Sequence, residues 1–261
     1  METIAKSAKM LEVASHPMIR ELLDLVVPLI PKEGRSERLS CSDSYNLEIF
    51  GMAGALSQSF ELLERSRNLI ISIPSGKYLE GQNINHYDWI EYHISTFLVT
   101  FVTVRDEVLQ LVNSVFCLGI DPRHCSVAVV TTNKWVMDTT IPKHLKAIEN
   151  VISSHRTTRN LLVHRGKTPS LNIWFKSANL DQLRIFALAV QHKPEKIPEE
   201  IKTMLNEAYV VALTQISEGL DAEISQLKTA VWQLLTDLHN TYSERRSFLS
   251  FVRTGGPHDP Q

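Results

Sequence analysis

The sequence predicts an all-α protein, a helical bundle with long central helices and at most one short irregular or β segment. Two long segments, residues 45–73 and 88–118, repeat apolar residues at helical spacing. A short β-branched run at residues 125–132 is the one convincing candidate for a strand. With 261 residues, of which 43% are hydrophobic and 21% charged, the composition is that of one large or two small globular domains.

Three parts are predicted along the chain, an N-terminal flank, a helical domain and a C-terminal tail, at residues 1–44, 45–242 and 243–261. The flank contains an amphipathic segment at residues 18–30 that is typical of a short helix. Pro28 and Pro31 stop that helix, because proline lacks the backbone N–H that a helix interior requires. Residues 32–44 are polar and are typical of a linker.

The two long helices differ in how their apolar residues are distributed. The helix expected at residues 45–73 has one apolar face and ends at the turn-forming run that begins with Pro74. Its apolar positions are Ile49, Met52, Leu56, Phe60, Leu63 and Ile70. The helix expected at residues 88–118 is apolar over most of its circumference, which is typical of a helix at the centre of a bundle. Gly119 supplies its end.

The second half of the chain contains the β-branched run and further helices. Residues 125–132 form either a short strand or a buried loop. Thr139 or Thr140, with Pro142, then begins a helix. That helix continues to Gly166, or it breaks into two halves near Ser153 and Ser154. Two more helices are expected, at residues 180–191 and 198–241.

Charge and composition exclude several classes of protein. A net charge of −2 argues against a protein that coats nucleic acid, so any site for a polyanion has to be local. The N-terminus lacks a signal-peptide core, and the apolar run at residues 94–104 is too short to span a bilayer. Three widely spaced cysteines, Cys41, Cys117 and Cys125, fit a reducing compartment. We therefore expect a cytoplasmic protein that has no membrane partner.

A strip of unopposed positive charge lies between Asn150 and Leu180, where no acidic residue occurs. Its basic residues are Arg156, Arg159, Arg165, Lys167 and Lys176. The strip surrounds the string Arg159-Asn160-Leu161-Leu162-Val163-His164, in which an arginine and a histidine are five residues apart. A cation, an amide and a titratable imidazole so close together predict a site for an anion or for acid–base chemistry.

The face on which Arg159 lies depends on whether its helix is continuous. In an unbroken helix, a rotation of about 100° per residue places Arg159 on the apolar stripe of the helix. That stripe consists of Leu145, Ile148, Ile152 and Val163. Asn160 and His164, four residues apart, then share a neighbouring flank. A cation on an apolar face needs a carboxylate or a phosphate, and Asp106 and Glu107 are the carboxylates we name.

A purely structural explanation of the same residues stands beside this one. Cations in the last turn of a helix complement its dipole, and the run His164-Arg165-Gly166-Lys167 before a proline is an ordinary way to end a helix. His93, at helical spacing between two aromatic residues, is likewise expected to be a core histidine.

The string Arg159-Asn160-Leu161-Leu162-Val163-His164 resembles the R-x4-6-H motif of the HEPN superfamily, the higher eukaryotes and prokaryotes nucleotide-binding domains. Members of this superfamily commonly carry a polar residue after the arginine. The segment 89–119 also resembles the long helix that precedes the motif in these all-α domains. By architecture the resemblance covers residues 45–191, whereas the motif itself covers only residues 159–164.

The resemblance implies metal-independent endoribonuclease activity in a homodimer, where two copies of the motif face each other. It implies catalytic roles for Arg159, Asn160 and His164, and the neighbouring cations expected to bind RNA are Arg156, Arg165 and Lys167. No metal or cofactor is expected. The expected partners are RNA, a second copy of the chain and an antitoxin protein, and the expected role is that of a toxin or a defence effector.

Two features limit what this resemblance implies. Some HEPN toxins carry a tyrosine two residues after the histidine as a target for modification, and this chain has Gly166 there. Many members have also lost catalysis. The alternative is therefore a catalytically silent helical module that binds a protein, a nucleotide or RNA, in which Arg159 closes an internal salt bridge.

Overall fold

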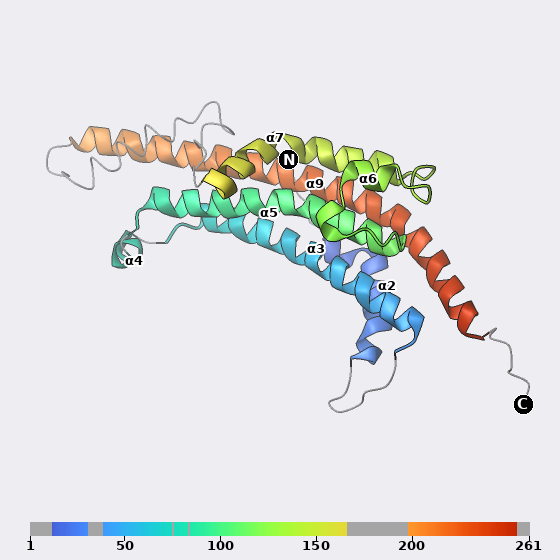
Figure 1. Ribbon diagram of the computed structural model, residues 1–261. Helices are drawn as coiled ribbons and strands as arrows, with labels where there is room; N and C mark the ends of the chain where they lie inside the picture. Colours follow the sequence, from blue (N-terminus) through green and yellow to red (C-terminus); the bar gives the residue numbers. More distant parts are fainter. Residues whose placement is uncertain (1–11, 31–38, 75, 83, 166–197, 255–261) are drawn as a thin grey trace, which may run out of the picture. The chain divides into compact units, whose positions relative to one another are not determined.

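A computed structural model describes residues 12–30, 39–74, 76–82, 84–165 and 198–254 of the chain, and the secondary structure in these ranges consists of helices joined by turns, without a strand (Figure 1). The long helices are α3 (Cys41–Ile71), α5 (His86–Val115), α7 (Ile141–Arg165) and α9 (Glu199–Thr254). The short ones are η1 (Val13–Ser15), α2 (Pro17–Val26), η2 (Val27–Leu29), α4 (Gly76–Gly81), η3 (Pro122–His124) and α6 (Val127–Thr131). The prediction of an all-α fold is confirmed. None of the helices in these ranges combines the length and the apolarity needed to cross a membrane.

Helix α3 begins earlier than the sequence pattern predicted, at Cys41 instead of near Tyr45. Ser40 and Asp43 explain this start. The backbone N–H of Asp43 donates to Ser40 Oγ at 3.0 Å, and the backbone N–H of Ser40 donates to Asp43 Oδ2 at 3.2 Å. This reciprocal pair satisfies N–H groups that a helix start leaves unpaired. The last residues of the expected linker are therefore helical.

Helix α5 ends at Val115, before the predicted end near Leu118. Cys117 has a φ of 51°, and Gly119 has a φ of 67°. The backbone N–H of Leu118 donates to the carbonyl of Asn113 at 2.9 Å, which closes the helix with Cys117 in the left-handed conformation. A cysteine, and not the glycine two residues later, therefore occupies the position where the helix stops.

The prediction of a strand or a buried loop within residues 125–132 was wrong, because residues 127–131 form helix α6. Ser126 caps this helix, since its side chain accepts a hydrogen bond from the N–H of Val129. Only Val130 of the β-branched run is buried. One buried side chain within a capped turn suits a helix, whereas a strand would need a partner to satisfy its backbone groups.

Helix α7 is continuous through Ser153 and Ser154, so the alternative of a break is excluded. Its apolar stripe is buried as expected, with Leu145, Ile148 and Ile152 each at most 2% exposed. Helix α9 runs on to Thr254, past the predicted end near Thr241. The helix expected at residues 180–191 lies outside the described residues.

The chain divides into two compact units, which we describe separately. Unit 1 comprises residues 1–60, 103–152 and 226–261, and unit 2 comprises residues 61–102 and 153–225. Each of the helices α3, α5, α7 and α9 contributes one segment to each unit. The end of α7, with the predicted site, belongs to unit 2.

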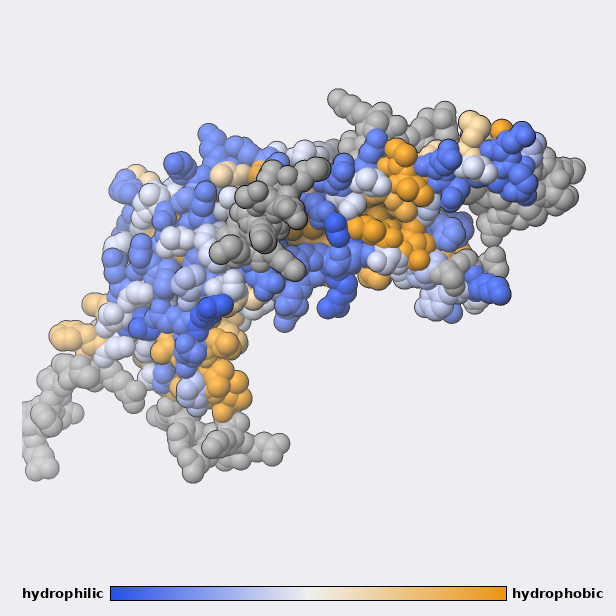
Figure 2. Space-filling model, turned by 180° about the vertical axis from the view of Figure 1, so that it is seen from behind, coloured by the Kyte–Doolittle hydropathy of each residue, from blue (hydrophilic) through white to orange (hydrophobic). Residues whose placement is uncertain are grey.

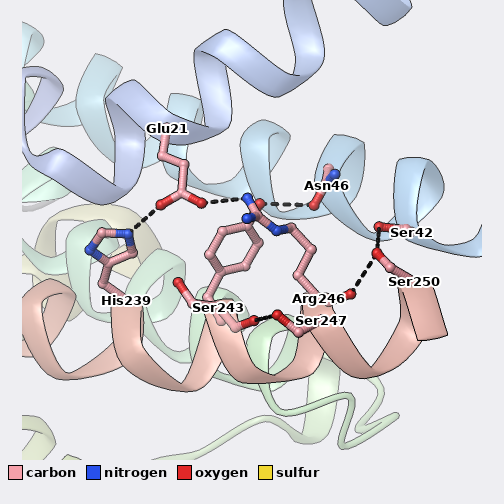
Figure 3. Close-up of polar contacts among 9 residues, drawn as sticks. Glu21, Ser42, Asn46, His239, Ser243, Arg246, Ser247 and Ser250 are labelled. Carbon is pink, nitrogen blue, oxygen red and sulfur yellow. Dashed lines mark hydrogen bonds and ion pairs between the residues drawn. The ribbon is translucent and has the colours of Figure 1, made fainter.

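Polar contacts attach α2 to α9 in unit 1. His16 caps α2 by accepting a backbone N–H on its Nδ1, and its Nε2 lies 3.2 Å from Thr236 Oγ1. Because Nδ1 accepts, Nε2 carries the proton and donates it. Glu21 accepts hydrogen bonds from His239 and Arg246, two residues of α9 that lie on either side of its carboxylate (Figure 3). These contacts fix α2 along the second half of α9.

Candidate functional site

The predicted site residues lie on the last turns of α7, within unit 2. The side chains of Arg156, Arg159 and Asn160 belong to the described part of the molecule. His164 and Arg165 are part of the helical backbone, but their side chains lie outside the described part, as does the whole of Lys167. The continuous helix places His164 about 140° around the axis from Arg159, because five residues rotate by about 500°.

Arg159 and Asn160 are in direct contact. The Nη1 of Arg159 donates a hydrogen bond to Asn160 Oδ1 at 3.1 Å, and both side chains are half-buried. Asn160 uses its carbonyl oxygen in this bond, so its NH2 group still has two donors to offer. The amide therefore holds the guanidinium in place without neutralising its charge.

The guanidinium of Arg159 keeps unused donor capacity. Its Nε is buried and has no hydrogen-bond partner among the residues that the structure describes. Within the described residues of unit 2, no carboxylate forms an ion pair with Arg159. A buried donor without a partner is unfavourable by about 1–3 kcal/mol. A ligand oxygen that accepts a hydrogen bond from Nε would recover this free energy.

The two carboxylates named from the sequence as partners of Arg159 are engaged with other residues of unit 1. Asp106 accepts a hydrogen bond from Arg105 at 3.0 Å. Glu107 accepts one from Ser59 Oγ at 2.8 Å. Burial raises the pKa of Glu107, the hydrogen bond from Ser59 opposes this rise, and Asp106 adds to it. Asp106 and Glu107 therefore have hydrogen-bond partners other than Arg159.

A buried histidine one helical turn before Arg159 pairs with a half-buried glutamate, and sequence reasoning did not single out this pair. His155 is 5% exposed, and its Nε2 lies 2.9 Å from Glu223 Oε1 on α9. The ring of Phe101 packs edge-on against His155, with centroids 5.3 Å apart. Because His155 and Arg159 are four residues apart on α7, they share one face of the helix.

A signal for this pair was present in the sequence. Glu223 falls on the same helical stripe as Ile216, Leu220 and Leu227, and those three side chains are fully buried. A carboxylate on a buried stripe requires a partner, and His155 is on the buried stripe of a neighbouring helix. His155 and Glu223 are 68 residues apart in the chain, so their pairing could not be predicted from local spacing.

Two helices of unit 2, α7 and α9, carry charge of opposite sign. The segment of α7 from Ser153 onward is basic and has no acid, whereas residues 199–225 of α9 contain acids with a single lysine, Lys202. These acids are Glu199, Glu200, Glu207, Glu218, Asp221 and Glu223. A polyanion would therefore approach this unit along α7 and be repelled along α9.

His93, the other histidine considered from the sequence, lies in the core. His93 is 7% exposed and packs against Trp89 and Tyr92, as expected for a core histidine. Burial lowers the pKa of His93, which favours its neutral form.

Comparison with protein families gave a match over half of the chain. A family model described as HEPN_Cthe2314-like HEPN matches residues 52–185 of this chain. The matched region starts within α3, includes α5 and α7, and contains Arg159, Asn160 and His164. It leaves α2 and α9 outside. No curated protein and no solved structure matches the chain.

Proposed function

The chain belongs to the HEPN family whose model matches residues 52–185, and from this premise we propose that it is a metal-independent endoribonuclease. The substrate is RNA, because RNA carries its own nucleophile in the 2′-hydroxyl. The 2′-oxygen attacks the adjacent phosphorus, the bond to the 5′-oxygen breaks, and a cyclic phosphate remains. The proton leaves the 2′-hydroxyl and a proton is delivered to the 5′-oxygen.

Three side chains of α7 carry this chemistry in the proposal. His164 takes or donates the proton, because an imidazole with an unperturbed pKa of about 6.5 does both near neutral pH. Arg159 stabilises the charge that develops on the phosphorane oxygens through its fork of N–H groups. Asn160 holds the guanidinium through the 3.1 Å hydrogen bond and directs its NH2 group toward a phosphate oxygen or the imidazole. Arg156, Arg165 and Lys167 bind the flanking phosphates.

The observation that carries the proposal is the state of Arg159. Its guanidinium is half-buried and bonded to a neutral amide, with an unused buried N–H and no carboxylate partner among the described residues of its unit. An arginine that serves only the fold would be neutralised by an acid. An arginine with a free donor and an uncompensated charge is suited to a phosphate that arrives with the substrate.

Cleavage of single-stranded RNA in the presence of EDTA tests the proposal. We expect the protein to leave cyclic phosphate ends, and we expect His164→Ala and Arg159→Ala each to abolish cleavage while the far-UV circular dichroism is unchanged. Arg65→Ala, on the exposed surface of α3 in the same unit, is the matched control and should cut at the wild-type rate. If both α7 variants cut normally, the site is assigned wrongly.

The second candidate function is a catalytically silent HEPN module. The family match and the all-α fold are expected of such a module as well. Thermal unfolding separates the two. If Arg159 is structural, its truncation should lower stability by about 1.5–3 kcal/mol, because its charged hydrogen bond to Asn160 would be lost. If Arg159 serves RNA, its truncation should change stability little and abolish cleavage.

The cellular role in the proposal is growth arrest, as a toxin restrained by an antitoxin protein or as a defence effector. The proposed active form is a homodimer, in which two copies of α7 form one groove. Expression of the wild-type chain should stop cell growth, and His164→Ala should relieve the arrest. Sedimentation velocity gives the oligomeric state, and a monomer that cuts RNA would remove the dimer from the proposal.

A further inference from the structure

Helix α9 carries two apolar stripes in unit 2. The first faces the core and includes Ala212, Ile216 and Leu220, which are at most 2% exposed. The second is on the surface, where Ile201, Met204, Ala208 and Val211 follow one another at spacings of three, four and three residues. Ile201, Met204 and Val211 are 40%, 64% and 56% exposed. We call these four residues the outer stripe. On the face of the molecule drawn in Figure 2, apolar patches lie among polar side chains.

The spacing of the outer stripe is that of a helix that packs against another helix. Apolar residues that alternate at three and four residues form the seam of a coiled coil. Single exposed apolar residues are common on a helix surface that faces water, and they follow no regular spacing. A row of them at regular spacing is typical of a contact surface. The outer stripe therefore predicts a partner helix, in addition to the core helices that cover the first stripe.

A row of acids follows the outer stripe along one edge. Glu200, Glu207 and Glu218 are exposed and fall within about 20° of one another around the helix axis. Among the described residues none of the three has an ion-pair partner, whereas Asp221 pairs with Arg67 and Glu223 pairs with His155. The acids that serve the fold are thus paired, and the acids beside the stripe are not.

We propose that the outer stripe of α9 is a docking surface for a basic amphipathic helix of another protein. The partner helix places apolar residues on Ile201, Met204 and Val211 and lysine or arginine residues opposite the glutamates. From Ile201 to Glu218 the surface is about 25 Å long at 1.5 Å per residue, which corresponds to about five turns of a partner helix. A surface of this size belongs to the weak, transient class, so we expect a Kd on the order of micromolar.

Charge argues against a second copy of this chain as the partner. Two outer stripes laid together would bring their glutamate rows into the same contact, and like charges there would repel. Among residues 153–160 of α7, the part of the helix in unit 2 whose side chains are described, the exposed ones are Ser153, Ser154, Arg156 and Thr157. One of these residues is basic and three are polar, so the described part of α7 in unit 2 exposes no apolar row that could fill the seam.

The test uses the full-length protein and a synthetic peptide of three heptads, with leucine at the seam positions and lysine at the flanking positions. A matched peptide carries glutamate in place of lysine. Binding is followed by fluorescence anisotropy of the labelled peptides. We expect the lysine peptide to bind and the glutamate peptide not to bind, and we expect salt to weaken the binding. The triple variant Glu200→Lys, Glu207→Lys, Glu218→Lys should reverse this preference.

Two neighbouring valines provide the matched control. Val210 and Val211 are 54% and 56% exposed, but they point about 100° apart around the helix, so only Val211 belongs to the outer stripe. Val211→Glu should lower the affinity for the lysine peptide at least tenfold, because it places a charge in the apolar contact. Val210→Glu should change that affinity less than twofold.

Four results would overturn the proposal: no binding of the lysine peptide, equal binding of both peptides, equal effects of the two valine variants, or no reversal by the triple lysine variant. Two others would identify a different occupant and overturn it as well. If Val211→Glu dissociates a dimer in sedimentation, the outer stripe joins two copies of this chain. If Val211→Glu alone increases hydrogen exchange within residues 166–197 of the monomer, the chain covers its own stripe. None of these results depends on whether the protein cuts RNA.

Discussion

The pair formed by His155 and Glu223 gives the most direct test of how α7 is held in unit 2. Glu223→Ala removes the carboxylate that lies 2.9 Å from His155 Nε2. The side chain of His155 is 6% exposed and that of Glu223 is 28% exposed, so water replaces the lost acceptor poorly on the histidine side. Hydrogen bonds that involve a charged group contribute about 1.5–3 kcal/mol, and the partial exposure of Glu223 places the expected loss at about 2 kcal/mol.

Thermal unfolding followed by circular dichroism measures this loss. A loss of about 2 kcal/mol lowers the unfolding midpoint of a chain of this size by about 4–8 °C. Glu223→Gln keeps an acceptor for the imidazole and should lower the midpoint by less than half as much. Glu218→Ala, on the exposed side of the same helix, is the matched control and should have no measurable effect.

The reasoning fails if Glu223→Ala and Glu218→Ala unfold at the same temperature. It also fails if Glu223→Gln is as unstable as Glu223→Ala, because the loss would then come from the charge and not from the hydrogen bond. A loss of stability in Glu223→Ala would show that the turn before Arg159 is anchored to α9. The backbone that carries the guanidinium of Arg159 would then be held in place.

Two further predictions concern unit 1. Burial and the nearby His239 lower the pKa of His16 to about 4, below its unfolded value of 6.5. The stability that neutral His16 contributes is therefore complete above pH 6.5 and is lost as the pH falls toward 4. His16→Asn, which can still cap α2, should reduce the difference between unfolding midpoints measured at pH 7 and pH 5; an unchanged difference would contradict this. Tyr242→Phe should lower stability by about 1–2 kcal/mol, because the buried Asn46 Oδ1 loses the donor that lies 2.8 Å away. Urea unfolding of Tyr242→Phe beside Ser247→Ala, an exposed residue of α9, checks this, and equal midpoints would refute it.

The sequence alone determined the fold class, the approximate extents of α3, α5 and α7, and the string from Arg159 to His164. These features depend on the spacing of apolar residues and on local identity, and both can be read within a few helical turns. The predicted ends of the helices were less accurate where a contact between residues close in the chain determines the end. The cap formed by Ser40 and Asp43 is one case, and the left-handed Cys117 is another.

Only the tertiary structure decided which side chains meet. The sequence indicated that Arg159 would lie on an apolar stripe and need an acid, and it named Asp106 and Glu107. In the structure those two carboxylates bind Arg105 and Ser59, and Arg159 binds the neighbouring Asn160. The pairing of His155 with Glu223 was equally hidden. The register between two helices is fixed by the burial of many side chains together, so it cannot be read from the periodicity of either helix alone.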